Sequence, residues 1–254
     1  MNLSIITINL NNCRGLEKTV LSVINQSYKD FEYIVIDGGS TDGSVELIKK
    51  HKEKIDTWVS EKDKGIFQAM NKGIAKATGK YLLFLNSGDS LVDNNVLKKF
   101  ASFRLEEDII YGNLFFTGGS EIPAWCPPTH LSFNHFVENS IPHQASFIKK
   151  SLFEKVGLYS EQLKISSDWK FFLDAVVKFN CTYKKIELFI SDFDVNGVSN
   201  NRKLLEDEKF HVISTEYANI IYQEYRQTYQ KLKHYKLSRL IKLIKKIGLL
   251  NKID

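Results

Sequence analysis

The sequence predicts an α/β fold in which a mostly parallel sheet is flanked by helices. Short runs of apolar and β-branched residues alternate with longer segments whose apolar residues recur at helical spacing. Short polar loops join the two kinds of segment, which is typical of βαβ crossovers between parallel strands. The chain has 254 residues, of which 43% are hydrophobic, and this is enough to bury the core of such a sheet.

The first part of the chain alternates between expected strands and expected helices. The strands that we expect are residues 3–8, 31–36, 57–60 and 81–85. The helices that we expect between them are residues 16–26, 45–51 and 66–77. Gly79 follows the third helix and ends it, as glycine commonly does after a last helical turn.

The second part of the chain holds shorter elements and then a helical tail. We expect strands near Tyr111 and Phe115, a loop over 123–130, and a loop over 140–148 that feeds another strand. Short helices at 151–156 and 170–178 and a last strand at 189–195 follow. From Leu204 on, the pattern is helical. We therefore expect an α/β domain over residues 1–203 and a basic, amphipathic helical extension over residues 204–254.

The composition limits the classes of protein and of site. The three cysteines are widely spaced and odd in number, which indicates neither a disulfide framework nor a zinc site and fits a reducing compartment. The net charge of +5 is uneven, because residues 226–254 hold nine Lys or Arg and one acidic residue. This asymmetry points to a basic tail that seeks a surface. The rest of the chain is slightly acidic and does not resemble a nucleic-acid binder.

The stretch Lys80 to Asp89, KYLLFLNSGD, is the centre of the predicted sheet. Its apolar run, residues 81–85, stops abruptly at a polar turn, which is typical of a strand that is buried on both faces. Asp89 follows Gly88, where the backbone can approach a ligand closely, so its carboxylate is suited to hold a hard cation and, through it, phosphates. The alternative is an Asx-rich turn that only closes a core strand.

Polar or acidic residues follow each of the early strands. They are Thr7 to Asn11, Asp37, Asp42, Asp63 and Asp89. Because ligands of open α/β sheets bind at the carboxyl ends of parallel strands, we expect these loops to meet in one crevice. Thr7, Asn9 and Asp37 suit a base and a ribose, since a carboxylate accepts from an imide N–H and from hydroxyls.

The phosphate-binding motifs of two common nucleotide-binding classes are absent from the sequence. No strand is followed by G-x-G-x-x-G or by G-x-x-x-x-G-K-[ST]. A divalent cation at Asp89, helped by Lys64, would then neutralise a leaving diphosphate. Asp168, at the start of a helix, is the best candidate for a base that activates an incoming hydroxyl. The alternative for Asp168 is an ordinary helix N-cap.

Two long motifs give the chain a family resemblance. TVLSVINQSYKDFEYIVIDGGSTDGS, residues 19–44, is followed by DKGIFQAMNKGIAKATGKYLLFLNSGD, residues 63–89. Together they resemble the family 2 glycosyltransferases, which are inverting enzymes with the GT-A fold. The chain is most similar to the bacterial branch that builds capsule and O-antigen repeat units. The resemblance covers residues 3–199.

The resemblance implies a nucleotide-sugar donor, with UDP as the expected nucleotide, and a role for each matching residue. The residues that would line the donor site are Thr7, Asn9, Asp37, Asp63, Lys64, Gly65, Asn71, Asn86 and Ser87. Asp37 would contact a uracil-like base, and Asp168 would be the catalytic base. His143 and Gln144 match a pair near the acceptor, and the aromatic face of Trp169 suits a sugar ring.

The metal motif departs from the family pattern. Many relatives have Asp-x-Asp-Asp where this chain has Asn86-Ser87-Gly88-Asp89, so Asp89 is the one carboxylate left. A single Mg²⁺ or Mn²⁺ would then be held mostly by diphosphate oxygens and water, with weak metal dependence. His143 is a candidate for a further ligand, and a loop histidine bonded to backbone is the alternative.

The tail contains an amphipathic segment, residues 237–247. Its six apolar residues fall on one side of a helix and its four Lys or Arg residues on the other. This pattern predicts a helix in a membrane interface, and hence a cytoplasmic protein peripheral to the inner face of the cytoplasmic membrane. The alternative is a helix docked on the domain or on a second subunit of a homodimer.

The sequence as a whole predicts an inverting transferase. It would move a sugar from a nucleoside diphosphate to a hydroxyl of a bacterial surface polysaccharide, carried on a lipid or an oligosaccharide. A sugar nucleotidyltransferase is one alternative, although the chain lacks the Gly-rich N-terminal loop expected of that class. A non-catalytic glycan- or membrane-binding protein with a degenerate site is the other.

Overall fold

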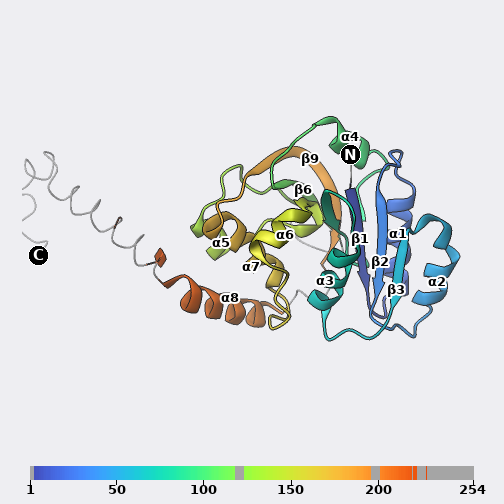
Figure 1. Cartoon of the computed structure of the whole chain (residues 1–254), viewed down its shortest axis with the longest axis horizontal. Coiled ribbons are helices and arrows are strands. Elements are labelled where there is room, and N and C mark those ends of the chain that lie inside the picture. The colour runs from blue at the N-terminus through green and yellow to red at the C-terminus, as the bar shows by residue number, and fades with distance from the viewer. Residues whose placement is uncertain (1–2, 118–122, 196–200, 219, 222–226, 228–254) are drawn as a thin grey trace, which may run out of the picture. The chain divides into compact units, whose positions relative to one another are not determined.

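The fold is built on one sheet that combines a parallel half with a mixed half (Figure 1). The computed structural model describes residues 3–117, 123–195, 201–218, 220–221 and 227. Contacts divide the chain into two units, Met1–Glu208 and Lys209–Asp254, and the sheet belongs to the first. The predicted helix at 237–247 lies outside the described residues.

The strand order in the sheet is β3-β2-β1-β4-β8-β6-β9-β5, with β7 paired to β6. The bounds are β1 Leu3–Asn9, β2 Glu32–Asp37, β3 Thr57–Ser60, β4 Tyr81–Phe84, β5 Ser90–Leu91, β6 Ile109–Thr117, β7 Ala124–Trp125, β8 Ser146–Lys149 and β9 Tyr183–Asp194. Strands β1 to β4 pair in parallel, whereas β8 runs antiparallel to both β4 and β6. The predicted α/β sheet is therefore confirmed, and its parallel part is the N-terminal half.

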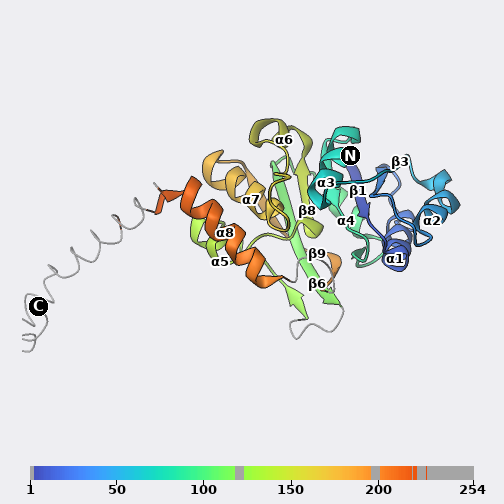
Figure 2. The same ribbon diagram turned by 90° about the horizontal axis from the view of Figure 1, so that it is seen from below.

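The helices cover both faces of the parallel half. The α-helices of the described residues are α1 Cys13–Ile24, α2 Ser44–Lys50, α3 Ile66–Lys76, α4 Val96–Ser102, α5 Phe133–Glu138, α6 Lys150–Val156, α7 Ser167–Leu173 and α8 Arg202–Glu216. Helix α3 lies on one face of β1 and β2 and α1 on the other (Figures 1 and 2). None of the described helices combines the length and the apolar character needed to cross a membrane.

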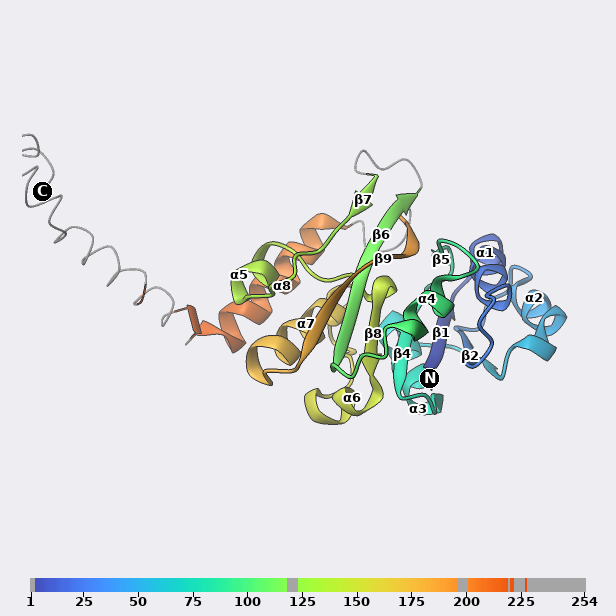
Figure 3. The ribbon, with the colours of Figure 1, turned by 90° about the horizontal axis from the view of Figure 1, so that it is seen from above.

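The strands and helices differ from the sequence expectation mainly in the second half of the chain. The two strands expected near Tyr111 and Phe115 are one strand, β6, which runs beside the long strand β9 (Figure 3). Strand β9 begins at Tyr183 instead of 189, because charged residues at its start hid its strand pattern. Helices α4 and α5 were not predicted from the sequence, and the helix expected at 170–178 is α7 followed by a π-helical turn.

The strand register brings the ends of the parallel strands to one edge of the sheet. Asn9 lies opposite Asp37, and Asp37 lies opposite Ser60. Beyond β4, the amide of Ser87 donates to Ile8 O at 3.0 Å, so the polar turn after β4 reaches the same edge. Strand β8 starts at this edge because it runs antiparallel to β4. The loops predicted to converge do converge.

Helix α3 packs closely on β1 because one of its residues has no side chain. A Cβ at Gly73 would lie 2.4 Å from Ile6 Cγ2, far inside normal contact, and both residues are buried. Gly73 is therefore required by packing and not by backbone conformation.

Gly73→Ala is expected to destabilise the protein by about 1–3 kcal/mol, because the added methyl group overpacks the contact with Ile6. The measurement is urea unfolding, with the exposed Lys76→Ala on the same helix as the control, for which a change within about 0.5 kcal/mol is expected. A stabilised Gly73→Ala variant would show that the helix can move away from the sheet at no cost.

Candidate active site

Asp37 is the most completely satisfied side chain at the carboxyl edge of the sheet. It is fully buried, and both of its oxygens accept hydrogen bonds. The donors are Asn9 Nδ2 at 2.8 Å, Ser40 Oγ at 2.6 Å, Ser40 N at 2.9 Å, Gly39 N at 3.2 Å and Ser60 Oγ at 2.6 Å. Burial raises the pKa of Asp37, but these donors outweigh it, so the pKa lies below its ordinary value.

Asp63 differs from Asp37 in having an oxygen without a donor in the part of the chain that the structure describes. Its Oδ1 meets the Lys72 ammonium at 2.5 Å, whereas no described residue donates to the buried Oδ2. The side chain is only 7% exposed. A Cβ at Gly38 would lie 3.4 Å from this Oδ2, so the free oxygen faces the loop after β2. A ligand that reaches this loop finds a buried acceptor there.

The loop between β3 and α3 contains the other residues predicted to lie over the nucleoside. The amide of Lys64 donates to Gln68 Oε1 at 2.9 Å, and its side chain is exposed. Gly65, at φ 152°, leads into α3. Asn71, on α3, is bonded to the segment before α7, because its Nδ2 donates to Tyr159 O at 2.9 Å and its Oδ1 accepts from Tyr159 N at 3.0 Å. These contacts favour a structural role for Asn71.

The turn after β4 holds a second buried carboxylate with few donors. Asp89 Oδ2 accepts from Asn86 N at 3.2 Å and Oδ1 from Asp194 N at 3.3 Å. Burial raises the pKa of Asp89 to about 6, although the nearby His143 and these amides act against the rise. Asn86 Oδ1 is also buried and has no hydrogen-bond partner among the described residues. One short turn therefore holds two side chains with oxygens suited to a hard cation.

Residues of α1 that the sequence analysis did not single out organise this turn. Thr19 Oγ1 accepts from Gly88 N at 3.0 Å and lies 2.6 Å from Asp89 O, and Lys18 Nζ donates to Gly88 O at 2.9 Å. Ser87 is held by Asn12, whose Nδ2 donates to Ser87 O at 3.0 Å.

Among the described residues, no three His, Cys, Asp or Glu side chains gather as a metal site.

A histidine joins this turn to the predicted base. His143 Nδ1 lies 2.7 Å from Asp168 Oδ2, and His143 Nε2 lies 3.3 Å from Asn86 Nδ2. In the tautomer that satisfies both contacts, Nδ1 donates to the carboxylate and Nε2 accepts from the amide. The side chains of His143 and Asp168 are 10% and 20% exposed. Asp168 therefore faces the carboxyl edge with its orientation fixed.

Asp168 does not cap α7. Ser166 occupies the N-cap position, and Asp168 is the second residue of the helix. The carboxylate of Asp168 also acts on Tyr159, whose buried hydroxyl has no hydrogen-bond partner among the residues that the structure describes. Burial and then the Asp168 carboxylate raise the pKa of Tyr159 well above its ordinary value.

Three other predicted site residues are buried in the protein. Thr7 is fully buried, and its hydroxyl lies 3.1 Å from Tyr33 Oη. Trp169 is 3% exposed, and its Nε1 donates to Phe136 O at 2.7 Å, which ties α7 to α5. This burial favours packing roles for both in place of the predicted ligand contacts. Gln144, beside His143, is 5% exposed.

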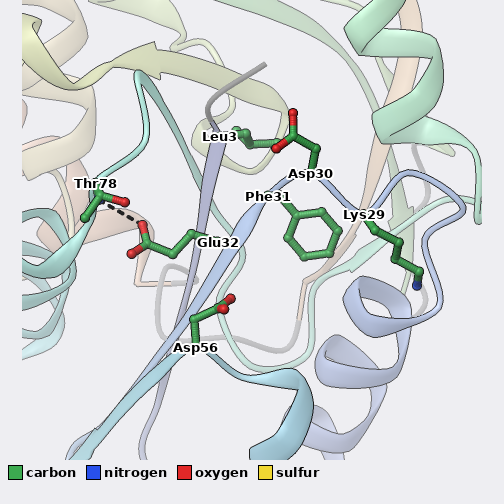
Figure 4. Close-up of a pocket in the computed structure, with 7 residues that line it drawn as sticks. All are labelled: Leu3, Lys29, Asp30, Phe31, Glu32, Asp56 and Thr78. Atoms are coloured by element: carbon green, nitrogen blue, oxygen red, sulfur yellow. Dashed lines mark hydrogen bonds between the residues drawn. The ribbon is translucent and has the colours of Figure 1, made fainter.

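A surface pocket of about 310 Å³ lies away from these residues, at the amino ends of β1 and β2 (Figure 4). It is lined by Leu3, Lys29, Asp30, Phe31, Glu32, Asp56 and Thr78. Two of its carboxylates hold the backbone, since Thr78 N donates to Glu32 at 2.8 Å and Tyr33 N donates to Asp56 at 2.7 Å. The pocket is therefore at the edge opposite the candidate active site.

Comparison with known proteins identifies the family. A sequence model described as Glycosyl transferase family 2 matches residues 4–154, more than half of the chain. The chain belongs to glycosyl transferase family 2. This glycosyltransferase is 34% identical over 208 residues to an uncharacterised glycosyltransferase of Mycobacterium tuberculosis, across 79% of this chain and 78% of that protein. It is 32% identical over 174 residues to a PGL/p-HBAD biosynthesis glycosyltransferase of the same organism, across 66% of this chain and 67% of that protein.

Solved structures support the predicted GT-A fold. TarS of S. aureus, in a fragment in complex with UDP, superposes with a TM-score of 0.64 at 19% identity, over 77% of this chain. This chain spans 61% of that fragment. The mannosyltransferase PcManGT of Pyrobaculum calidifontis, in complex with GDP-Man and Mn²⁺, superposes with a TM-score of 0.57 at 14% identity, over 76% of this chain and 56% of that one.

Asp37→Asn is expected to lower the free energy of unfolding by about 2 kcal/mol at pH 7, because an amide cannot accept all of these hydrogen bonds. The folded-state pKa of Asp37 is lowered, so its stabilisation is present above the unfolded pKa of about 3.9 and is lost as the pH falls through the folded value. Urea unfolding at pH 7 and pH 3 should therefore show a variant deficit that shrinks in acid. The exposed Asp207→Asn is the control, and a deficit that grows in acid would refute this assignment.

Proposed function

We propose that this glycosyltransferase inverts the anomeric centre of a UDP-sugar and transfers the sugar to a hydroxyl of a bacterial surface glycan. The observation that carries the proposal is the juxtaposition at one sheet edge of buried, unpaired oxygens with the His143–Asp168 pair. The unpaired oxygens are Asn9 Oδ1, Asp63 Oδ2 and Asn86 Oδ1. Buried acceptors without donors indicate a ligand that supplies donors or a cation.

For the base of the nucleotide, we favour Asp63 over the residue expected from the sequence. Asp37 was expected to contact the base, but five protein donors already occupy its oxygens. Its role would be to order Ser40 and Asn9 around the pocket. The free Oδ2 of Asp63 would accept the imide N–H of uracil. Leu10, exposed beside Gly38, offers an apolar surface for the ring.

The diphosphate would lie over the turn after β4. Asn86 Oδ1 and Asp89 would hold one Mg²⁺ or Mn²⁺, with phosphate oxygens and water completing its ligands. Bound there, the cation would neutralise charge on the departing UDP. Lys64, exposed at the same edge, and Ser87 would add polar contacts to the phosphates.

Asp168 would act as the general base. The acceptor oxygen attacks the anomeric carbon on the face opposite UDP, the bond from that carbon to the diphosphate oxygen breaks, and the electron pair leaves with UDP. The hydroxyl proton passes to Asp168. His143 keeps the carboxylate oriented by donating to Oδ2 at 2.7 Å. With Gln144, it would also border the acceptor.

The proposal for the acceptor rests on the family branch, on the name of one relative and on the basic segment at the end of the chain. The capsule and O-antigen branch of the family suggests a lipid-linked glycan, and the name of the mycobacterial PGL/p-HBAD biosynthesis relative suggests another glycan as a second candidate. The basic amphipathic segment 237–247 would bring the enzyme to the cytoplasmic face of the membrane where such acceptors are anchored. Docking of this helical extension on a second subunit is the competing outcome.

Asp168→Asn is expected to lower sugar transfer, measured as UDP release from a panel of UDP-sugars, by about 10²–10⁴-fold. UDP affinity by calorimetry should stay within about twofold, since Asp168 does not touch the nucleotide in this mechanism. The exposed Asp207→Asn is the control. Turnover by Asp168→Asn close to that of the unchanged enzyme would remove Asp168 from the chemistry.

UDP with Mn²⁺ is expected to raise the melting temperature of the unchanged enzyme, and Asp63→Asn should weaken UDP binding by about tenfold. The same variant should bind CDP relatively better, because an amide can donate to the cytosine ring nitrogen that replaces the imide N–H. Glu61→Gln is the control, because Lys72 forms an ion pair with Glu61 as well as with Asp63 and the variant removes one negative charge beside it. If Asp37→Asn alters the ratio of UDP affinity to CDP affinity and Asp63→Asn does not, Asp37 and not Asp63 contacts the base.

The same measurements separate the rival functions. Stabilisation by nucleoside triphosphates in preference to UDP would favour a sugar nucleotidyltransferase. Binding of a glycan or of vesicles with no nucleotide binding and no UDP release from any donor would favour a non-catalytic binding protein.

A further inference from the structure

The loop that leads into α7 is held by a carboxylate from α8. Glu208 Oε1 accepts from Lys164 N at 2.7 Å, and Oε2 accepts from Ile165 N at 3.3 Å, Ser166 N at 3.1 Å and Ser166 Oγ at 2.6 Å. Three consecutive backbone amides that point to one anion form a nest, and here the anion is part of the same chain. Hydrogen bonds to a charged acceptor are stronger than neutral ones, so this contact fixes the loop firmly.

This anchor lies immediately beside the proposed base. Ser166 is fully buried and is the N-cap residue of α7, and Asp168 is two residues further along in the first helical turn. A shift of Ser166 would therefore carry Asp168 away from His143. The other end of the same loop is tied to α3 by the Asn71–Tyr159 pair.

We propose that Glu208 is a positioning residue for Asp168. It touches neither substrate nor reacting atoms, and acts through Ser166 by fixing where α7 begins. The inference rests on the proposed role of Asp168 as the base. The start of α8 would then help to build the proposed active site. From the sequence, these residues were expected to belong to an extension that begins after residue 203.

The test compares Glu208→Gln with the matched Glu206→Gln, an exposed glutamate on the same helix. In Glu208→Gln an amide NH₂ faces backbone N–H donors, so the loop loses its anion while the side chain keeps its size. Ser166→Ala is a milder second variant, because it removes one of the four donors. Three quantities are measured: the rate of UDP release from the best UDP-sugar of the panel, the affinity for UDP, and amide hydrogen exchange.

The proposal predicts a split between turnover and binding. Glu208→Gln should lower UDP release by about 10- to 100-fold, because small misplacements of a catalytic group have effects of that size. UDP affinity should remain within about twofold. Amide exchange should accelerate about tenfold over residues 164–168 and stay unchanged over residues 32–40. Ser166→Ala should shift the same quantities in the same direction by a few-fold, and Glu206→Gln should shift none of them.

Two results would overturn the proposal. One is a Glu208→Gln enzyme with unchanged turnover, and the other is a loss of UDP affinity that matches the loss of turnover, since that indicates general disruption. If Glu208→Gln does not fold, Ser166→Ala with normal exchange and normal turnover overturns it. If the unchanged enzyme neither binds UDP nor releases it from any donor, the proposed function fails first, and local exchange still decides whether Glu208 anchors the loop.

Discussion

The antiparallel pairing of β8 with β4 is the contact on which the whole site depends. The parallel strands β1 to β4 collect polar loops at one edge, whereas the proposed base, Asp168, lies on α7. Because β8 runs in the opposite direction, its first residues lie at that edge, and the short turn before it sets His143 against Asn86. The imidazole then contacts Asp168, so one strand pairing joins the loops of the parallel half to the proposed base.

Two buried carboxylates at this edge show how the number of hydrogen-bond donors sets the direction in which a pKa shifts. Asp37 and Asp89 are both almost fully buried, and burial alone raises the pKa of each. Asp37 meets hydroxyls, an amide side chain and two backbone amides, and its pKa is lowered. Asp89 meets two long backbone contacts, and its pKa rises to about 6. Protein donors therefore already stabilise the negative charge of Asp37. The charge of Asp89 has few donors, and a bound cation would stabilise it more.

The parallel half could be predicted from the sequence because strand patterns and strand ends obey simple rules. Asp37, Asp63 and Asp89 each follow an apolar run, and parallel strands bring such ends together. The direction of β8 leaves no mark in the sequence, so the His143–Asp168 contact across 25 residues was not predicted. The sequence leaves the role of Trp169 open because an aromatic face suits both a sugar and a protein core, and the burial of Trp169 favours the core. Thr19 and Glu208 were missed because ordinary helix positions carry no sign of a distant backbone partner.

The paired contacts of Asn71 with Tyr159 have a consequence for the side chains that this position tolerates. The side-chain amide donates one hydrogen bond to the carbonyl of Tyr159 and accepts one from the N–H of the same residue, as a residue of a neighbouring antiparallel strand would. Aspartate would set an oxygen against the Tyr159 carbonyl, leucine would leave both peptide groups unmatched, and glutamine would overshoot by a methylene. A single asparagine on a helix thus holds both backbone polar groups of one loop residue, and this double contact restricts the side chains that position 71 accepts.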